Sequence, residues 1–253
     1  MEEHIFKRFE IKYRLEEEQY KILRQRIDSF LKEDCYGETD ICNCYYDTPD
    51  FRLIRNSIEQ SVYKEKLRLR SYDVPACNEA QVFLELKKKF QGVVYKRREN
   101  LSIQEAEAYL NHGQKPDWDS QILQEIDWVL HYYGHIGPAM YIAYRRLAML
   151  EREADMMCGG QDFDMSPNGN QNLRVTFDWD IRWRTEKVNL GAGIFGTPLL
   201  SAGQRIMEIK TPGAIPKWLT DILDELKLYP VSFSKYGKAY EQLQNKLRNE
   251  NIA

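Results

Sequence analysis

Four cationic side chains recur at every second position of residues 63–72, YKEKLRLRSY. They are Lys64, Lys66, Arg68 and Arg70. Because successive side chains of a strand point to opposite faces, these four would share one face, and Leu67 and Leu69 would lie on the other. Ammonium and guanidinium groups at this spacing could bind an anion such as phosphate. The charged face of a strand usually contacts water, so the pattern allows either an anion site or a solvated face.

A second charged segment, residues 83–100 (FLELKKKFQGVVYKRREN), allows a test of the first interpretation. A two-residue turn at its centre would close it into a hairpin. Lys87 would then face Lys96, and Glu85 would face Arg98. Two lysines that face each other destabilise a bare sheet. A chain keeps such a pair when an anion lies between them.

The same alternation occurs in three further segments. Glu10 and Lys12 share a face of one segment, and Glu208 and Lys210 share a face of another. One face of residues 174–184 carries Arg174, Thr176, Asp178, Asp180, Arg182 and Arg184. The opposite faces are apolar and need to be covered by helices. If helices cover the outside of the sheet, the charged faces line the inside; an open sheet with a wet, charged face is the alternative.

Eight segments have the composition and period-two pattern of strands. They cover residues 5–14, 41–46, 61–72, 81–90, 92–99, 141–151, 173–184 and 204–210. Most connections between them are too short or too turn-like for crossover helices, so we expect a mainly antiparallel sheet. Eight strands suffice to close a barrel with an interior. With no break in composition, we expect one α+β domain over residues 1–253.

Helices are predicted between and after these strands. Residues 15–31 have an apolar side at helical spacing. Ser102 and Glu105 have the spacing of a capping box, and a helix before Gly134 should end there. Pro216 begins a further helix, and the last one follows from residue 234. A flexible loop is predicted for 155–170 because it is rich in Gly, Asn, Asp and Pro.

Composition excludes several classes of protein. The 253 residues are 43% hydrophobic and 30% charged, with a net charge of −3, which is typical of a globular protein with a core. A nucleic-acid binder would normally be basic, so we expect no nucleic-acid partner. No signal peptide or membrane-spanning run is found. Five cysteines without zinc spacing predict buried or half-buried free thiols and a reducing, cytoplasmic location.

Nine segments together resemble a known family. They are FKRFEIKYRL, YYDTPDF, EKLRLRSY, FLELKKK, VVYKRR, YIAYRRLAM, RVTFDWDIRW, MEIKT and SFSKYGKAYE. In this order they resemble the VTC domain of polyphosphate polymerases, in the triphosphate tunnel metalloenzyme (CYTH-like) superfamily, as a stand-alone bacterial-type form. The resemblance implies an eight-stranded antiparallel β-barrel tunnel with helices packed outside. Cations that line such a tunnel hold a triphosphate, so the four cations of 63–72 are expected to point inward.

The resemblance also implies roles for single residues. Catalytic positions are Lys12, Arg145, Arg174, Ser234 and Lys235. Phosphate- or nucleotide-binding positions are Lys66, Arg68, Arg70, Lys87, Lys96 and Arg98. Glu208 matches the metal-binding glutamate, with Glu10 and Asp178 as further candidates; Asp178 could instead pair with an arginine of the tunnel.

The implied reaction is transfer of the terminal phosphoryl group of a nucleoside triphosphate, with ATP as the expected donor. The acceptor is phosphate or a growing polyphosphate chain. Such a transfer is catalysed mainly by positioning and charge neutralisation. A divalent metal, Mn²⁺ or Mg²⁺, is expected because it bridges phosphate oxygens through hard ligands.

Two alternatives share the same residues: a tunnel-type triphosphatase and a non-catalytic module that binds polyphosphate or nucleotide. Tunnel triphosphatases typically carry Glu-x-Glu-x-Lys in the first strand, whereas this chain has Arg8 in the first place. The exchange of a carboxylate for a cation weakens the hydrolase interpretation and suits an acceptor phosphate chain. The regulatory domain and membrane helices of eukaryotic relatives have no counterpart in the sequence, so we expect neither control by inositol phosphates nor coupling to membrane translocation. Oligomeric state does not follow from the sequence.

Overall fold

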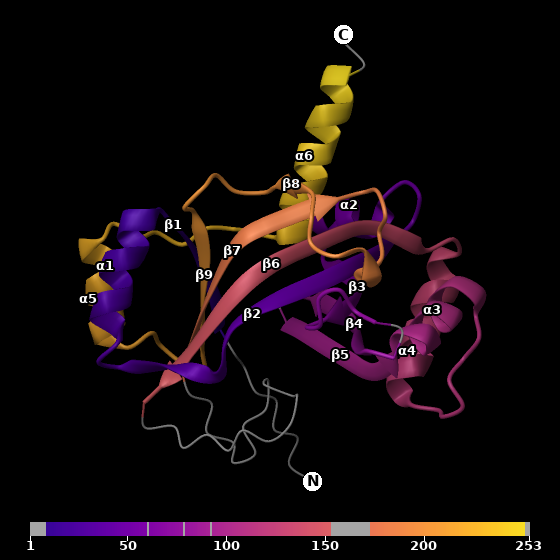
Figure 1. Ribbon diagram of the computed structural model, residues 1–253, viewed down its shortest axis with the longest axis horizontal. Helices are drawn as coiled ribbons and strands as arrows, with labels where there is room; N and C mark the ends of the chain where they lie inside the picture. The colour runs from indigo at the N-terminus through magenta and orange to yellow at the C-terminus, as the bar shows by residue number, and fades with distance from the viewer. Residues whose placement is uncertain (1–8, 60, 78, 92, 153–172, 251–253) are drawn as a thin grey trace. The chain divides into compact units, whose positions relative to one another are not determined.

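A computed structural model describes residues 9–59, 61–77, 79–91, 93–152 and 173–250 of the chain (Figure 1). These residues form an α+β structure with one large sheet. Its strands are β1 (Phe9–Leu15), β2 (Leu31–Asp47), β3 (Tyr63–Ser71), β4 (Gln81–Phe90), β5 (Val93–Ser102), β6 (Gly137–Glu151), β7 (Arg174–Arg184), β8 (Thr197–Pro198) and β9 (Arg205–Thr211). The helices are α1 (Glu17–Ile27), α2 (Arg52–Ile58), α3 (Ile103–His112), α4 (Gln121–Tyr133), α5 (Lys217–Glu225) and α6 (Lys235–Glu250), with a 3₁₀ turn, η1, at Leu190–Ala192.

The order of strands along the sheet is β1-β9-β7-β6-β2-β3-β4-β5, and the short β8 pairs with β7. The registers that the structure gives are antiparallel, including those of β1 with β9 and of β3 with β4. The predicted fold class, α+β with a large antiparallel sheet, is confirmed. Closure of this sheet into a tunnel stays a prediction.

The chain divides into two compact units, each assembled from three segments. Unit 1 contains residues 1–39, 145–180 and 200–233, and unit 2 contains residues 40–144, 181–199 and 234–253. Strands β2, β6 and β7 continue from one unit into the other. Neither unit is a continuous stretch of sequence, and the prediction of one domain over residues 1–253 is untested.

In unit 1, α1 and α5 lie side by side (Figure 1) and cover the apolar face of β1, β9 and β7. The backbone N–H of Glu16 donates to the Gln19 side chain at the start of α1 (3.0 Å), which satisfies one group at that helix end. The apolar spacing places Leu23 and Ile27 in the core. Their partners include Tyr13, Leu15, Val175, Phe177, Met207, Ile209, Leu219, Ile222 and Leu223.

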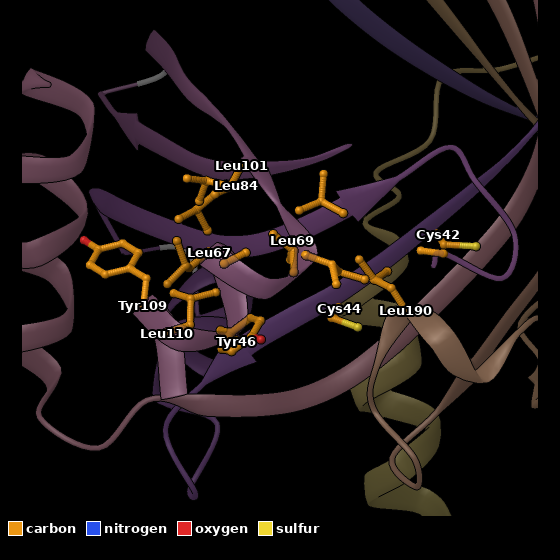
Figure 2. Packing of buried hydrophobic residues seen from close by; sticks show 14 of the residues in the cluster. Cys42, Cys44, Tyr46, Leu67, Leu69, Leu84, Leu101, Tyr109, Leu110 and Leu190 are labelled. Atoms are coloured by element: carbon orange, nitrogen blue, oxygen red, sulfur yellow. The ribbon is translucent and has the colours of Figure 1, made fainter. Parts of the chain in front are cut away.

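In unit 2, α3 and α4 cover the apolar face of β3, β4 and β5. Figure 2 shows the core between them, where Leu67, Leu69 and Leu84 from the sheet pack near Tyr109 and Leu110 of α3. Burial of a leucine of this kind contributes about 1.5–3 kcal/mol. In both units, the predicted cover of the apolar strand faces by helices is therefore confirmed, and the charged side chains occupy the opposite face.

Three predicted helix ends, at Ser102, Gly134 and Pro216, are also confirmed. At α3 the N–H of Glu105 donates to Ser102 Oγ (3.2 Å), and the N–H of Ser102 donates to Glu105 Oε2 (2.8 Å), as a capping box requires. Gly134 is the C-cap of α4, with φ 75°, a region that favours glycine. Pro216 is the N-cap of α5.

Some predictions were wrong or incomplete. The strand expected from residue 41 begins at Leu31, and the helix expected to reach residue 31 ends at Ile27. Helix α2 and strand β8 were not predicted, because both are too short to show a clear period. The predicted loop 155–170 and residues 5–8 of the first strand lie outside the described residues.

The cysteines are partly as expected. Cys42 and Cys44 are buried free thiols, whereas Cys35 and Cys77 are exposed, so the expectation of buried or half-buried thiols was wrong for these two. Cys158 lies outside the described residues. In the described part of the chain, the structure contains no helix long and apolar enough to span a membrane.

Candidate functional site

The hairpin of β4 and β5 has the predicted register. Lys87 pairs with Lys96, and Glu85 pairs with Arg98. Gln91, in the turn, has a φ of 47°, in the left-handed region that tight hairpin turns need. On the other side of β4, strand β3 continues both rows. The lysine row is Lys66, Lys87 and Lys96, and the Glu85 row is Arg68, Glu85 and Arg98.

Glu85 is the centre of this charged face. Arg68 Nε donates to its Oε2 (2.6 Å), and Arg98 donates to its Oε1 from Nε (2.9 Å) and Nη2 (2.6 Å). Arg70 Nε lies 3.7 Å from Oε2, and Lys96 Nζ lies 3.5 Å from Oε1. The Glu85 side chain is only 1% exposed. Burial would raise its pKa, but the surrounding cations, Arg68 first, hold the pKa well below its ordinary value.

The two predicted arginines of β3 are fixed differently. Arg68 Nη1 donates to the Tyr45 hydroxyl (3.1 Å), and burial of Arg68 is outweighed by the Glu85 carboxylate, so the pKa of Arg68 is raised. Arg70 is more deeply buried, with Nε donating to Asn43 Oδ1 (3.0 Å). Arg68 is therefore the better placed of the two to bind a ligand.

The lysine row meets the start of α6 within unit 2. Lys66 Nζ donates to Ser234 Oγ (2.9 Å), and that oxygen accepts from the N–H of Gly237 (3.2 Å), as an N-cap does. The ammonium of Lys235 lies 4.2 Å from the centroid of the Tyr144 ring. Three residues predicted to bind or transfer phosphate thus come together where a helix N-terminus also favours an anion.

The surroundings of the row are only partly as predicted. Lys87 is half-buried, whereas the Lys96 side chain is 31% exposed. The shared face of the two lysines is confirmed, but their enclosure in a cavity stays a prediction.

Lys87→Gln is expected to weaken binding of inorganic triphosphate several-fold without loss of fold stability, because it removes one charge from a row of like charges. Lys88→Gln is the matched control, since Lys88 is the next residue and pairs with Glu125 on the opposite face (3.0 Å). Titration calorimetry and thermal unfolding of both variants provide the measurement. Equal losses of affinity in the two variants would contradict a specific lysine row.

A second charged cluster lies in unit 1, on the charged face of β1 and β9. Lys12 pairs in register with Glu208, and Glu10 pairs with Lys210. Lys12 Nζ lies 3.0 Å from Glu10 Oε1 and 3.6 Å from Glu208 Oε2, and it donates to the carbonyl of Phe233 (3.1 Å). Burial opposes the charge of Lys12, but the carboxylates of Glu208 and Glu10 outweigh it and raise its pKa.

Glu10 and Glu208 fit the expected divalent metal in part. Both carboxylates converge on the Lys12 ammonium, so their oxygens already surround one cationic position. Mg²⁺ is often bound by one or two carboxylates together with phosphate oxygens of the substrate. No group of three or more His, Cys, Asp or Glu side chains in the described part of the chain could hold a metal ion. Substrate oxygens would therefore have to complete the coordination.

Asp178, the third metal candidate, has the contacts of a counter-ion. Its two oxygens accept from Arg146, at 2.6 Å from Nε and 2.8 Å from Nη2, and its side chain is 0% exposed. These contacts favour the alternative in which Asp178 pairs with an arginine.

Arg146 is a residue that the sequence reasoning missed. The predicted Arg145 lies on the other face of β6, where Nη2 donates to Glu38 (2.5 Å) and the guanidinium lies 5.2 Å from the Trp179 ring centroid. Arg146 shares the face of Asp178. The sequence contained a signal for this. Arg145 and Met149 are four residues apart in one strand, so they share a face, and Met149 is an apolar residue of the unit 1 core. The structure does not bring Arg145 to the charged face.

Arg174 does lie on that face. Its register partner is Lys210, and its Nη2 lies 3.7 Å from Asp34 Oδ2. Burial raises the pKa of Asp34, although Tyr36 and Arg174 act against the shift. Arg8 lies outside the described residues.

The profile of the VTC domain matches residues 7–157 and 165–244. The chain belongs to the VTC domain family. This membership indicates a triphosphate-processing function related to nucleotides or polyphosphate. No protein with curated annotation matches the chain.

The solved structures that are similar to this VTC domain include two candidate adenylate cyclases. A candidate adenylate cyclase from Bacillus halodurans is 16% identical with a TM-score of 0.49, over 89% of this chain and 92% of the other. A candidate adenylate cyclase from Vibrio parahaemolyticus is 10% identical with a TM-score of 0.44, over 92% of this chain and 97% of the other. Similarities at this level do not bear on substrate or reaction.

Proposed function

We propose that this VTC domain is a polyphosphate polymerase-type phosphotransferase. It would move the terminal phosphoryl group of a nucleoside triphosphate, with ATP as the expected donor, to phosphate or a growing polyphosphate chain. The lysine row carries the proposal. Lys66, Lys87 and Lys96 lie in register across three neighbouring strands, an arrangement that destabilises a sheet unless a polyanion binds to it.

The residues around this row suit phosphate oxygens. The guanidinium groups of Arg68 and Arg98 offer forked N–H donors, and lysines act as point charges. Ser234 and the N-terminus of α6 add a hydroxyl and backbone N–H donors beside Lys66. Such groups neutralise and orient a phosphate chain, which is most of what phosphoryl transfer requires from a protein.

Glu10 and Glu208 are the residues that would hold Mn²⁺ or Mg²⁺. When bound, such an ion supplies positive charge to phosphate oxygens that it contacts. Lys12, whose ammonium lies between the two carboxylates, could itself contact a phosphate oxygen. Asp178 would hold Arg146 in place on the same face.

The two alternatives remain distinct proposals. A triphosphatase would use the same cations with water as acceptor. A binding module would need no carboxylate beside Lys12, and the nearly buried Glu208 therefore favours an enzyme.

The purified protein should be incubated with ATP and Mn²⁺, and the products resolved by length on a gel. Long phosphate chains are the expected result. Release of inorganic phosphate alone would identify a triphosphatase, and absence of turnover would identify a binding module. A parallel reaction with a chelator in place of Mn²⁺ should give no chains.

A further inference from the structure

Glu85 is an acidic side chain among the cations of strands β3, β4 and β5. In the described parts of β3, β4 and β5, it is the single acidic side chain on this face. The cations on the same face are Lys64, Lys66, Arg68, Arg70, Lys87, Lys89, Lys96 and Arg98.

The Glu85 carboxylate contacts both Nε and Nη2 of each of two guanidinium groups, those of Arg68 and Arg98. Arg68 uses Nε and Nη2 towards Oε2, both at 2.6 Å. Arg98 uses Nε and Nη2 towards Oε1, at 2.9 and 2.6 Å. Glu85 thus occupies N–H donors of Arg68 and Arg98 that a phosphate would otherwise use, and its negative charge offsets one positive charge of the face.

The distance to the lysine row makes this charge relevant to any ligand there. The rows are two residues apart along β4, which is about 7 Å in a strand. At about 7 Å and an effective dielectric constant of about 20, the repulsion between two unit charges corresponds to more than a tenfold change in affinity.

We infer that Glu85 is an internal counter-anion that sets the affinity of this face for polyanions by competing with bound phosphate for Arg68 and Arg98. The inference rests on the proposed function in that it concerns the same phosphate site. A residue that only held the arginines in place would act in the opposite direction, since its loss would release them and weaken binding. The sign of the change therefore separates the two roles.

The experiment compares binding of inorganic triphosphate, without metal, to the wild type, Glu85→Gln and Glu125→Gln by titration calorimetry at several salt concentrations. Glu125 is a matched control, because it bridges Lys88 (3.0 Å) and Arg97 (3.1 Å) on the opposite face of the same hairpin. We expect Glu85→Gln to bind at least about tenfold more tightly. Its salt dependence should be steeper, because the site has one more net positive charge. Glu125→Gln should bind as the wild type does.

Affinity of Glu85→Gln that is equal to or weaker than that of the wild type would overturn the inference. If this variant does not fold, Lys96→Gln is compared with the double variant Glu85→Gln/Lys96→Gln. The double variant should then bind more tightly than Lys96→Gln alone, and equal binding would overturn the inference.

The proposed function can fail separately. If the wild type makes no phosphate chains but Glu85→Gln still binds triphosphate more tightly, only the proposed reaction is wrong. If the wild type binds no triphosphate, a gain of binding in Glu85→Gln supports the counter-anion, whereas no binding by either protein refutes it.

Discussion

Glu208→Gln is expected to lower turnover by at least about 100-fold while triphosphate binding is kept or becomes tighter. The substitution removes a carboxylate that could ligate a metal, and it also removes a negative charge from an anion site. Glu208 lies 3.6 Å from Lys12 Nζ and 3.3 Å from Lys210 Nζ. The loss of a possible metal ligand and the loss of a negative charge therefore affect the same cluster of side chains. The measurement is triphosphate affinity with and without Mn²⁺, alongside turnover.

Glu225→Gln is the control for this experiment. Glu225 also belongs to unit 1 and pairs with an arginine, Arg26, but on the exposed surface of α5. If Glu208→Gln keeps the activity and metal dependence of the wild type, the metal-binding assignment is wrong. Joint loss of stability, binding and activity would instead identify Glu208 as a counter-ion of the two lysines.

Arg146→Met is expected to lower the free energy of unfolding by roughly 3–5 kcal/mol, because it leaves a fully buried carboxylate, Asp178, without its bidentate partner. Arg145→Met should change it by less than about 1 kcal/mol, because the pair with Glu38 is about half exposed. Urea unfolding of the two variants, which differ by one position in the chain, measures the difference.

The double variant Arg146→Met/Asp178→Asn tests the cause. Neutralising Asp178 should recover part of the loss, since the buried charge is removed with its partner. Similar losses for Arg145→Met and Arg146→Met, or no recovery in the double variant, would show that the buried pair is not what stabilises this face.

The sequence predicted the strands and the hairpin register well because both depend on local rules. Alternation of side chains is a property of a single strand, and a two-residue turn determines which residues face each other. Lys87 opposite Lys96 follows from these two rules alone. Helix ends at Ser102 and Gly134 were predicted for the same reason, since a cap involves neighbouring residues.

Features that depend on distant packing were not predicted. The choice between Arg145 and Arg146 depends on which face of β6 the helices cover, and the family resemblance at YRR did not distinguish the two positions. The early start of β2 at Leu31 depends on partner strands far away in the chain. The contacts that make Glu85 a centre of four cations likewise come from three strands, and no single segment contains them.

The pairing of β1 with β9 has a consequence for synthesis of the chain. β1 ends at Leu15, and its partner β9 begins at Arg205, roughly 190 residues later. At about 5–20 residues per second, the ribosome needs roughly 10–40 s to make the intervening chain. For that time the alternating apolar residues Ile11, Tyr13 and Leu15 lack the strand that they pair with in the finished protein. The hydrogen-bonding edge of β1 that β9 covers in the folded protein should therefore stay unpaired in newly made chains until β9 has been made.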